Sequence, residues 1–270
     1  MVQNTTGNNL KFTFLRVLFF WFCSMIVFAA IGPLMKFLPT LWSLIFTTTV
    51  ASIVTLGLTA IFIRWERVKF NDVGLRPDNN SFYRALIGFI IGLLLPCLQA
   101  APVLLTGHVT LSISPNVTLT EVLLHLLLFV GLSFREEIAF RAYPLRSLNY
   151  AIGPLYALLF ISLIFGIEHV IGGSSVLHGI VGAGIGGLLY GIITLKTKGL
   201  AYPIGIHAAW NFGQWALGFQ GKPGILEVSI DKEYKDCIDL IGFISYLIVM
   251  GLTIGLVYFY WKRSSLKSRS

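Results

Sequence analysis

Ionisable side chains in apolar surroundings are the most informative feature of this sequence. Glu136, Glu137 and Arg141 lie in or beside one apolar segment, His169 closes the next one, and His207 lies inside a later one. Charged groups at membrane depth are costly, so such residues usually line a cavity and act there. The chemistry to be explained is therefore that of two carboxylates, two imidazoles and a guanidinium.

The first segment carries the pattern Glu-Glu-x-x-x-Arg. On a helix, Glu137 and Arg141 are four residues apart and share a face, so they can form an ion pair. Glu136 points about 100° away from that face and has no obvious local partner, which suits a general base. The alternative is an interfacial charge cluster at a helix end, with Arg135 and Arg146 nearby.

Two further pairs have a spacing of four residues. Phe165 and His169 fall on one helix face, although a lone histidine at a helix end is often structural. Glu168, beside it, faces elsewhere and is the weaker candidate. His207 and Asn211 also share a face, and both can donate a hydrogen bond to one point, as a developing oxyanion requires. The alternative for this pair is a polar contact between two helices.

The depth of the motif residues in the membrane supports the hypothesis that the motifs form one site. The midpoint between Glu136 and His169 lies near Gly153, which with Pro154 suits a turn. A hairpin folded there brings Glu136 and His169 to one level, where they could hold and deprotonate a water molecule. Flat spanning helices would keep His207 away from that level, so the grouping requires a projecting hairpin, or helices tilted or broken around a cavity.

Composition defines the class of protein. The chain has 270 residues, of which 56% are hydrophobic and 12% are charged, and its mean hydropathy is +0.80. A soluble domain averages about 25% charged residues. The formal charge of +8 does not indicate nucleic acid, since the sequence has no RNA- or DNA-binding motif. The three cysteines form neither a disulfide framework nor a Cys-x-x-Cys metal site.

A spanning helix needs about 20 mostly apolar residues. By that rule the sequence predicts an all-α, polytopic integral membrane protein, a bundle of about eight transmembrane helices that forms a single domain over 1–270. The predicted spans are 12–31, 41–63, 82–106, 118–142, 150–171, 175–195, 200–219 and 240–261.

The distribution of basic residues predicts the orientation. With both termini in the cytoplasm, 16 of the 20 Lys and Arg residues fall on the cytoplasmic side, and only Lys36, Lys222, Lys232 and Lys235 fall on the other. Such a bias is typical of a protein with both ends inside. It does not distinguish the plasma membrane from the endoplasmic reticulum. The acidic segment 220–239 is predicted to be a surface loop on the outer side.

The predicted sixth helix is rich in glycine. Gly182 with Gly186, and Gly187 with Gly191, have the small-x-x-x-small spacing that lets helix backbones approach closely. We interpret this as tight packing inside one bundle, with a dimer face as the alternative, and the oligomeric state stays open.

The three motifs resemble those of the CAAX-processing and bacteriocin-processing intramembrane proteases, also called the CPBP or abortive-infection family. The resemblance covers roughly 125–220, within an expected protease core of about 118–220. It is carried, in order, by Glu136-Glu137-x-x-x-Arg141, Phe165-x-x-x-His169 and His207-x-x-x-Asn211. The run from Tyr190 to Phe212 also matches the family's usual approach to its last motif.

The resemblance implies a catalytic site in a water-filled cavity within the bilayer. It implies that Glu136 and His169 activate water, that His207 and Asn211 stabilise the oxyanion, and that Glu137, Arg141 and Phe165 support the site. The expected activity is hydrolysis of a peptide bond in a membrane-associated protein or peptide, prenylated or not. The expected partners are that substrate and the lipid bilayer, with no nucleic acid.

The family has been described both as metalloproteases and as metal-independent glutamate proteases. The sequence has no His-Glu-x-x-His helix, which argues against a zincin-type site, and no cofactor is predicted. Zinc is the alternative, with Glu136, His169 and His207 as ligands and water in the fourth position. Two other functions stay open: a non-enzymatic membrane scaffold or immunity factor that binds peptides, and a proton-coupled transporter, against which the lack of internal repeats counts.

Overall fold

The computed structural model describes residues 7–267, and the fold is all-α as predicted. The long helices are α1 (Gly7–Leu34), α2 (Thr40–Glu66), α3 (Ser81–Leu104), α4 (Leu119–Arg141), α6 (Pro154–Ile171), α7 (Gly184–Thr197), α8 (Ala201–Ala216) and α9 (Lys235–Lys267). Shorter elements are α5 (Tyr143–Ile152), the 3-10 turns η1 (Phe70–Val73) and η3 (Lys232–Tyr234), the π-helical η2 (Leu177–Ala183), and the strands β1 (Val109–Ile113) and β2 (Leu226–Ile230).

Six helices in the described part of the chain are long and apolar enough to cross a membrane. They correspond to the first, second, third, fifth, sixth and eighth predicted spans, which confirms a polytopic integral membrane protein. The remaining two predicted spans are the helices α4 and α8. These two carry most of the polar motif residues, and α8 has only 16 residues.

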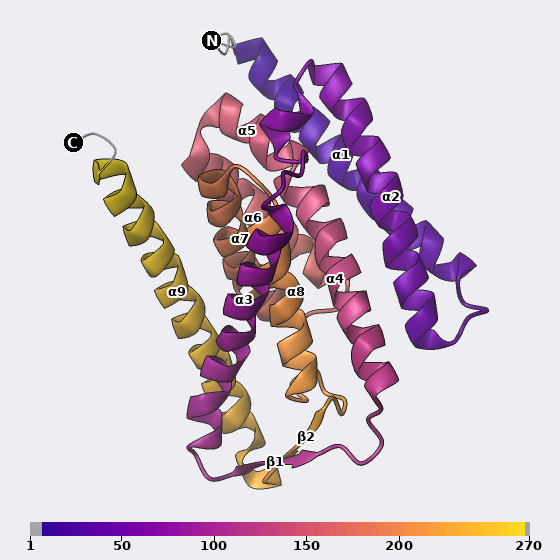
Figure 1. Ribbon diagram of the computed structural model, residues 1–270, viewed down its shortest axis with the longest axis vertical. Helices are drawn as coiled ribbons and strands as arrows, with labels where there is room; N and C mark the ends of the chain where they lie inside the picture. Colours follow the sequence, from indigo (N-terminus) through magenta and orange to yellow (C-terminus); the bar gives the residue numbers. More distant parts are fainter. Residues whose placement is uncertain (1–6, 268–270) are drawn as a thin grey trace.

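The helices α4 and α8 lie inside the bundle rather than at its rim. The packing partners of α8 are α3, α4 and α7, while α4 also packs on α2 (Figure 1). Glycine at the crossing of α3 and α8 makes their approach possible: a Cβ at Gly205 would overlap the Ala85 carbonyl, and one at Gly92 would overlap Ile206. The two helices that carry most of the polar motif residues thus pack against apolar helices.

The turn predicted at Gly153 is present, with a short helix before it. Gly153 has φ +79°, a value that favours glycine, and Pro154 occupies the first turn of α6, where proline is well tolerated. The chain between α4 and this turn is not a loop but the helix α5, which sequence reasoning did not predict as a separate element. Because α5 lies between them in the chain, α6 does not begin directly where α4 ends.

Polar contacts hold α5 in place beside the bundle. The Ser147 hydroxyl donates to Glu66 on α2 at 2.7 Å, and Arg16 on α1 lies 3.4 Å from the same carboxylate. Arg146 donates to the carbonyl of Thr194 on α7 at 2.8 Å, and burial lowers the pKa of its guanidinium. The short helix therefore links α1, α2 and α7 at one end of the molecule.

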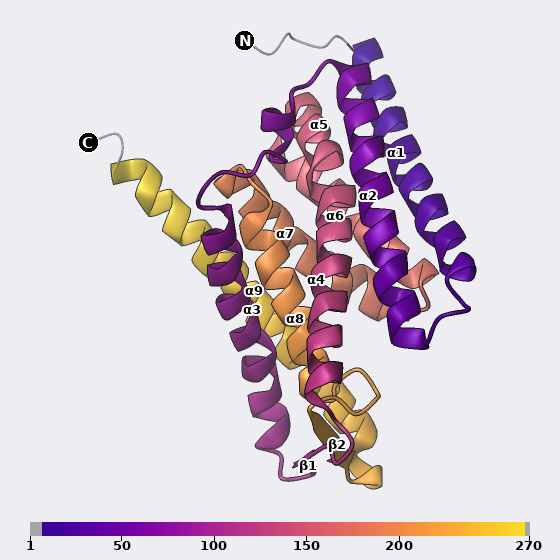
Figure 2. The same ribbon diagram turned by 45° about the vertical axis from the view of Figure 1, so that its right-hand side comes forward.

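The two ends of the molecule differ in structure. Helix α1 begins and α9 ends at the end where α5 lies, whereas β1 and β2 lie at the opposite end (Figures 1 and 2). The strands pair antiparallel, with Val109 opposite Ile230 and Ile113 opposite Leu226. They join the α3–α4 connection to the predicted surface loop 220–239, part of which is therefore β2. The start of α1 and the end of α9 lie at the same end of the molecule, as expected for a chain that crosses the membrane an even number of times.

Candidate active site

The helix α4 starts in water and ends in the core. Its first turn is a capping box in which the Glu121 amide donates to the Thr118 hydroxyl at 3.2 Å and the Glu121 carboxylate accepts from the Thr118 amide at 3.1 Å. This fixes where the helix begins. Its last nine residues, 133–141, are almost entirely buried. The Glu-Glu-x-x-x-Arg motif is therefore carried into the centre of the bundle.

Glu137 is the centre of a buried polar cluster. It is fully buried and lies 3.3 Å from Arg141 Nη1, which confirms the predicted ion pair on one face of α4. The same Oε1 atom is 2.9 Å from Nδ1 of His207 on α8. An ionised carboxylate can only accept, so His207 donates from Nδ1. Glu137 thus fixes the orientation of the imidazole, a contact that sequence reasoning did not predict.

Aromatic rings surround the buried guanidinium of Arg141. Its centre lies 4.2 Å from the Phe165 ring and 5.6 Å from that of Tyr190, distances at which the ring faces attract a cation. Helix α7 approaches closely at Gly187, where a Cβ would lie 3.1 Å from Arg141 Nη2 and 2.9 Å from the Phe165 ring. The predicted role of the glycines in packing within the bundle is confirmed here.

Glu136 faces His207 from the other side. Its Oε2 lies 3.5 Å from Nε2 of His207, which is too long for a good hydrogen bond. The Glu136 side chain keeps 11% of its surface exposed, whereas that of Glu137 keeps none. The ring of Tyr190 stacks on His207 with centroids 4.5 Å apart. One carboxylate therefore holds the imidazole, and the other stands opposite its second nitrogen and keeps a small exposed fraction.

Helix α6 brings His169 to the level of this cluster. Arg135 on α4 lies 2.6 Å from Glu168 on α6, and these two residues are the sequence neighbours of Glu136 and His169. This places Glu136 and His169 at a similar level, as predicted, through an ion pair that sequence reasoning did not predict. Glu168 also accepts from Trp21 Nε1 on α1 at 2.8 Å.

Phe165 links the two histidines. Its ring meets that of His169 edge-on at 4.5 Å and that of His207 at 6.1 Å. His169 Nδ1 is 2.9 Å from the Phe165 carbonyl, and since a carbonyl only accepts, Nδ1 donates and leaves Nε2 for another partner. The predicted helix face of Phe165 and His169 is therefore present, and it faces the same space as His207.

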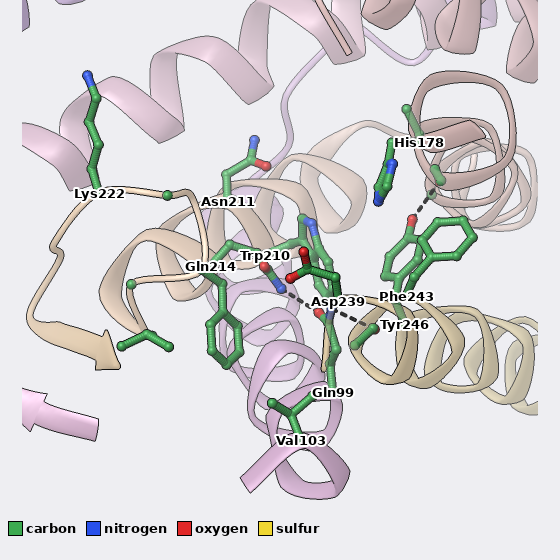
Figure 3. A pocket seen from close by; sticks show the side chains of 18 of the residues that line it. Gln99, Val103, His178, Trp210, Asn211, Gln214, Lys222, Asp239, Phe243 and Tyr246 are labelled. Atoms are coloured by element: carbon green, nitrogen blue, oxygen red, sulfur yellow. Dashed lines mark hydrogen bonds between the residues drawn. The ribbon is translucent and has the colours of Figure 1, made fainter. Parts of the chain in front are cut away.

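A cavity of about 850 Å³ lies in front of these residues. His169, His207 and Asn211 line the cavity. Glu136 does not line it, but its carboxylate lies 3.5 Å from Nε2 of His207, which does. Figure 3 shows Asn211 and Gln214 of α8 on one wall, with Phe243 and Tyr246 of α9 on the other. Gln214 donates to Gln99 on α3, so the cavity wall also uses helices outside the expected core of 118–220.

The residues named for a metal do not form a ligand set in this arrangement. Among the described residues, no group of three or more His, Cys, Asp and Glu side chains could hold a metal ion. His207 uses Nδ1 for Glu137, and the Phe165 ring contacts both histidines. Glu136, His169 and His207 therefore do not offer one ion three ligands here.

The contacts that sequence reasoning missed all join separate helices. They are the Glu137–His207 hydrogen bond, the Tyr190–His207 stack, the Arg135–Glu168 pair and the Gln99–Gln214 contact. A spacing of four residues reveals partners on one helix only. The sequence offered one signal for the Tyr190–His207 stack, which is that Tyr190 begins the run up to Phe212 that resembles the protease family. Nothing in the sequence indicated the other three contacts.

A cavity lined by histidines, with buried carboxylates beside it, in a bundle of apolar helices is typical of an enzyme site in a membrane protein. Residues 118–213 match the family model Rce1-like, described as type II CAAX prenyl endopeptidase Rce1-like. The match contains all three motifs and confirms the resemblance of this segment to the CAAX-processing intramembrane proteases. No curated protein matches the chain at a significant level.

Proposed function

We propose that the protein is a glutamate-type intramembrane endopeptidase that hydrolyses a peptide bond of a membrane-associated protein or peptide. The observation that carries the proposal is the pair of carboxylates around one imidazole, with Glu137 on Nδ1 and Glu136 opposite Nε2 of His207, beside a cavity that His169 also lines. Two carboxylates in different environments can take different chemical tasks.

Water activation falls to Glu136 and His169. A water molecule held between them gives its proton to the Glu136 carboxylate, and its oxygen forms a bond to the scissile carbonyl carbon. The carbonyl electron pair moves to oxygen. When the tetrahedral intermediate collapses, the carbon–nitrogen bond breaks and Glu136 returns the proton to the leaving amine. The partial exposure of Glu136 supports this role, because water must reach it.

Oxyanion stabilisation falls to His207 and Asn211. Asn211 lines the cavity, and its amide donates without any change of protonation state. His207 already donates Nδ1–H to Glu137, so it donates from Nε2 only when both nitrogens carry protons. Glu137 then faces both positive groups, His207 and Arg141. Donors fixed before the reaction stabilise the developing charge most effectively.

The orientation is proposed from charge. Both termini are assigned to the cytoplasm because the Lys and Arg residues gather at the end of the molecule where α1 begins and α9 ends. The membrane is the plasma membrane or the endoplasmic reticulum.

A panel of fluorogenic peptides, prenylated and unmodified, tests the proposal on purified protein in detergent. Wild type and Glu136→Ala are compared with and without a chelator. The expected result is cleavage that is lost in Glu136→Ala and kept in chelator. Full cleavage by Glu136→Ala would contradict the role of Glu136. Loss in chelator that zinc reverses would make Glu136, His169 and His207 metal ligands, in an arrangement different from the one described.

A further inference from the structure

A chain of amide contacts joins three helices beside the cavity. Gln99 Nε2 on α3 donates to the carbonyl of Gly242 on α9 at 3.1 Å, and Gln214 Nε2 on α8 donates to Gln99 Oε1. Neither glutamine belongs to the three motifs, and both are only partly buried. The contacts therefore place two side-chain amides on the wall of the cavity that His169 and His207 also line (Figure 3).

The Gly242 carbonyl fixes the direction in which each amide points. A backbone carbonyl only accepts hydrogen bonds, so the Gln99 amide turns its Nε2 atom towards Gly242. Its Oε1 atom is then left for Gln214 and accepts from the Nε2 atom of that residue. A reversed Gln99 amide would set two acceptors against each other on one side and two donors on the other. The orientation of Gln214 is thus set by the backbone of a different helix, α9.

This orientation leaves one hydrogen-bond acceptor open to the cavity. Among the described residues, the Gln214 side chain contacts only Gln99, through Nε2, so its Oε1 atom has no partner there. That oxygen is also not one of the buried polar atoms without a partner, so it is accessible. An acceptor that loses water without gaining a donor costs free energy. A substrate that fills the cavity must therefore bring a donor to this atom.

Gln214 continues the face of α8 that carries the proposed oxyanion donors. His207, Asn211 and Gln214 follow at spacings of four and three residues, so they share one helix face, and all three line the cavity. At about 1.5 Å per residue, Gln214 lies about 10 Å along the axis from His207 and about 4.5 Å from Asn211. An extended peptide advances about 3.3 Å per residue. Gln214 is thus about two or three substrate residues from the reacting carbonyl.

From these observations we infer that Gln214 binds the substrate through its Oε1 atom, which accepts a hydrogen bond from a main-chain N–H about two or three residues from the scissile bond. The substrate lies extended along α8 and is recognised at this position by its backbone. Proline, which has no N–H, is excluded there. Gln99 acts through Gln214 as a positioning residue. The inference rests on the proposed function and adds a specificity determinant to the same site.

A series of ester-substituted peptides tests the inference on the wild-type protein. The parent is a peptide that the purified protein cleaves in detergent. In each member of the series an ester oxygen replaces one backbone N–H, at every position except the scissile bond. The member with its ester about two or three residues from that bond should raise KM about tenfold with kcat little changed, because Gln214 Oε1 then has no donor.

Two variants connect the effect to Gln214. Gln214→Leu should raise KM for the parent peptide by about the same factor, and the sensitive ester should have no further effect in it, as expected for the two partners of one hydrogen bond. The matched control is Ser245→Ala. The Ser245 hydroxyl joins α9 to the Gln99 carbonyl at 2.9 Å but does not line the cavity. This variant should have a lower melting temperature, with KM and the ester effect as in wild type.

The outcomes separate this inference from the proposed function. A wild-type KM that no ester changes would overturn the inference, and so would an ester effect that is equally large in Gln214→Leu. A lower melting temperature of Gln214→Leu with normal KM would also overturn it, because Gln214 would then only join α8 to α3. These three results leave the protease standing. No cleavage of any peptide in detergent would overturn the protease and this binding role together.

Discussion

Two ion pairs on α4 use residues two positions apart for different purposes. Arg135 pairs with Glu168 on α6 and lies over the ring of Phe28, 4.6 Å from its centre. Glu137 pairs with Arg141 and also holds His207. The first pair connects α4 to α6 and α1, and neither of its residues lines the cavity. The second pair holds a histidine that does.

The difference follows from helix geometry. Successive residues on a helix point about 100° apart, so positions 135, 136 and 137 face three directions. Arg135 pairs with Glu168 on α6, whereas Glu137 and Glu136 approach His207 on α8 at its Nδ1 and Nε2 atoms. One short stretch of α4 thus contacts a neighbouring helix, orients an imidazole and places a second carboxylate beside the same imidazole.

The largest expected effect is on Glu136. Its replacement, Glu136→Gln, removes the proposed base while keeping the shape of the side chain, and should lower kcat by about 10²–10⁴-fold with no change in melting temperature in detergent. The control on the same helix is Glu121→Gln, since glutamine also serves in a capping box. Equal activities of the two variants would contradict the assignment.

Glu137 should matter for stability as well as for activity. Glu137→Ala leaves Arg141 buried without its counter-charge, a change that typically costs about 3–5 kcal/mol. Thermal unfolding in detergent measures this loss. The double variant Glu137→Ala/Arg141→Met should regain stability without regaining cleavage, because His207 still lacks its acceptor. Recovery of both would show that Glu137 has a purely structural role.

Asn211 should affect the rate alone. Removal of one oxyanion donor, in Asn211→Ala, is expected to lower kcat by about 10²–10³-fold with KM little changed. No hydrogen bond to another helix involves its side chain among the described contacts; its carbonyl accepts from Gln220. A lowered melting temperature with normal kcat would instead support a helix–helix contact.

The smallest effect on activity is expected for Glu168. Glu168→Gln removes the charge opposite Arg135, so unfolding should become easier by about 1–3 kcal/mol, while kcat falls less than tenfold. Arg135→Gln combined with Glu168→Gln should restore stability, since a pair replaced together is often neutral. A double-mutant cycle on melting temperature and kcat checks both statements.

The sequence predicted the helices, the turn at Gly153 and the Glu137–Arg141 pair because these depend on local spacing. The presence of Glu136, His169, His207 and Asn211 around one region was also predicted, but their roles stay predictions. The α5 helix was missed because a short helix between two spans has no apolar run of its own length. The contacts of His207 with Glu137 and Tyr190 depend on how α4, α7 and α8 pack, which no spacing within one helix determines.

The central claim is that the Glu136 carboxylate on α4 reacts, whereas the Glu168 carboxylate on α6 positions α6 against α4 through Arg135. The most direct test measures kcat and melting temperature for Glu136→Gln and Glu168→Gln in one preparation with one cleavable peptide. The account predicts that Glu136→Gln is inactive but as stable as wild type, and that Glu168→Gln is active but less stable. The reverse pattern, an active Glu136→Gln beside a stable and inactive Glu168→Gln, would contradict it.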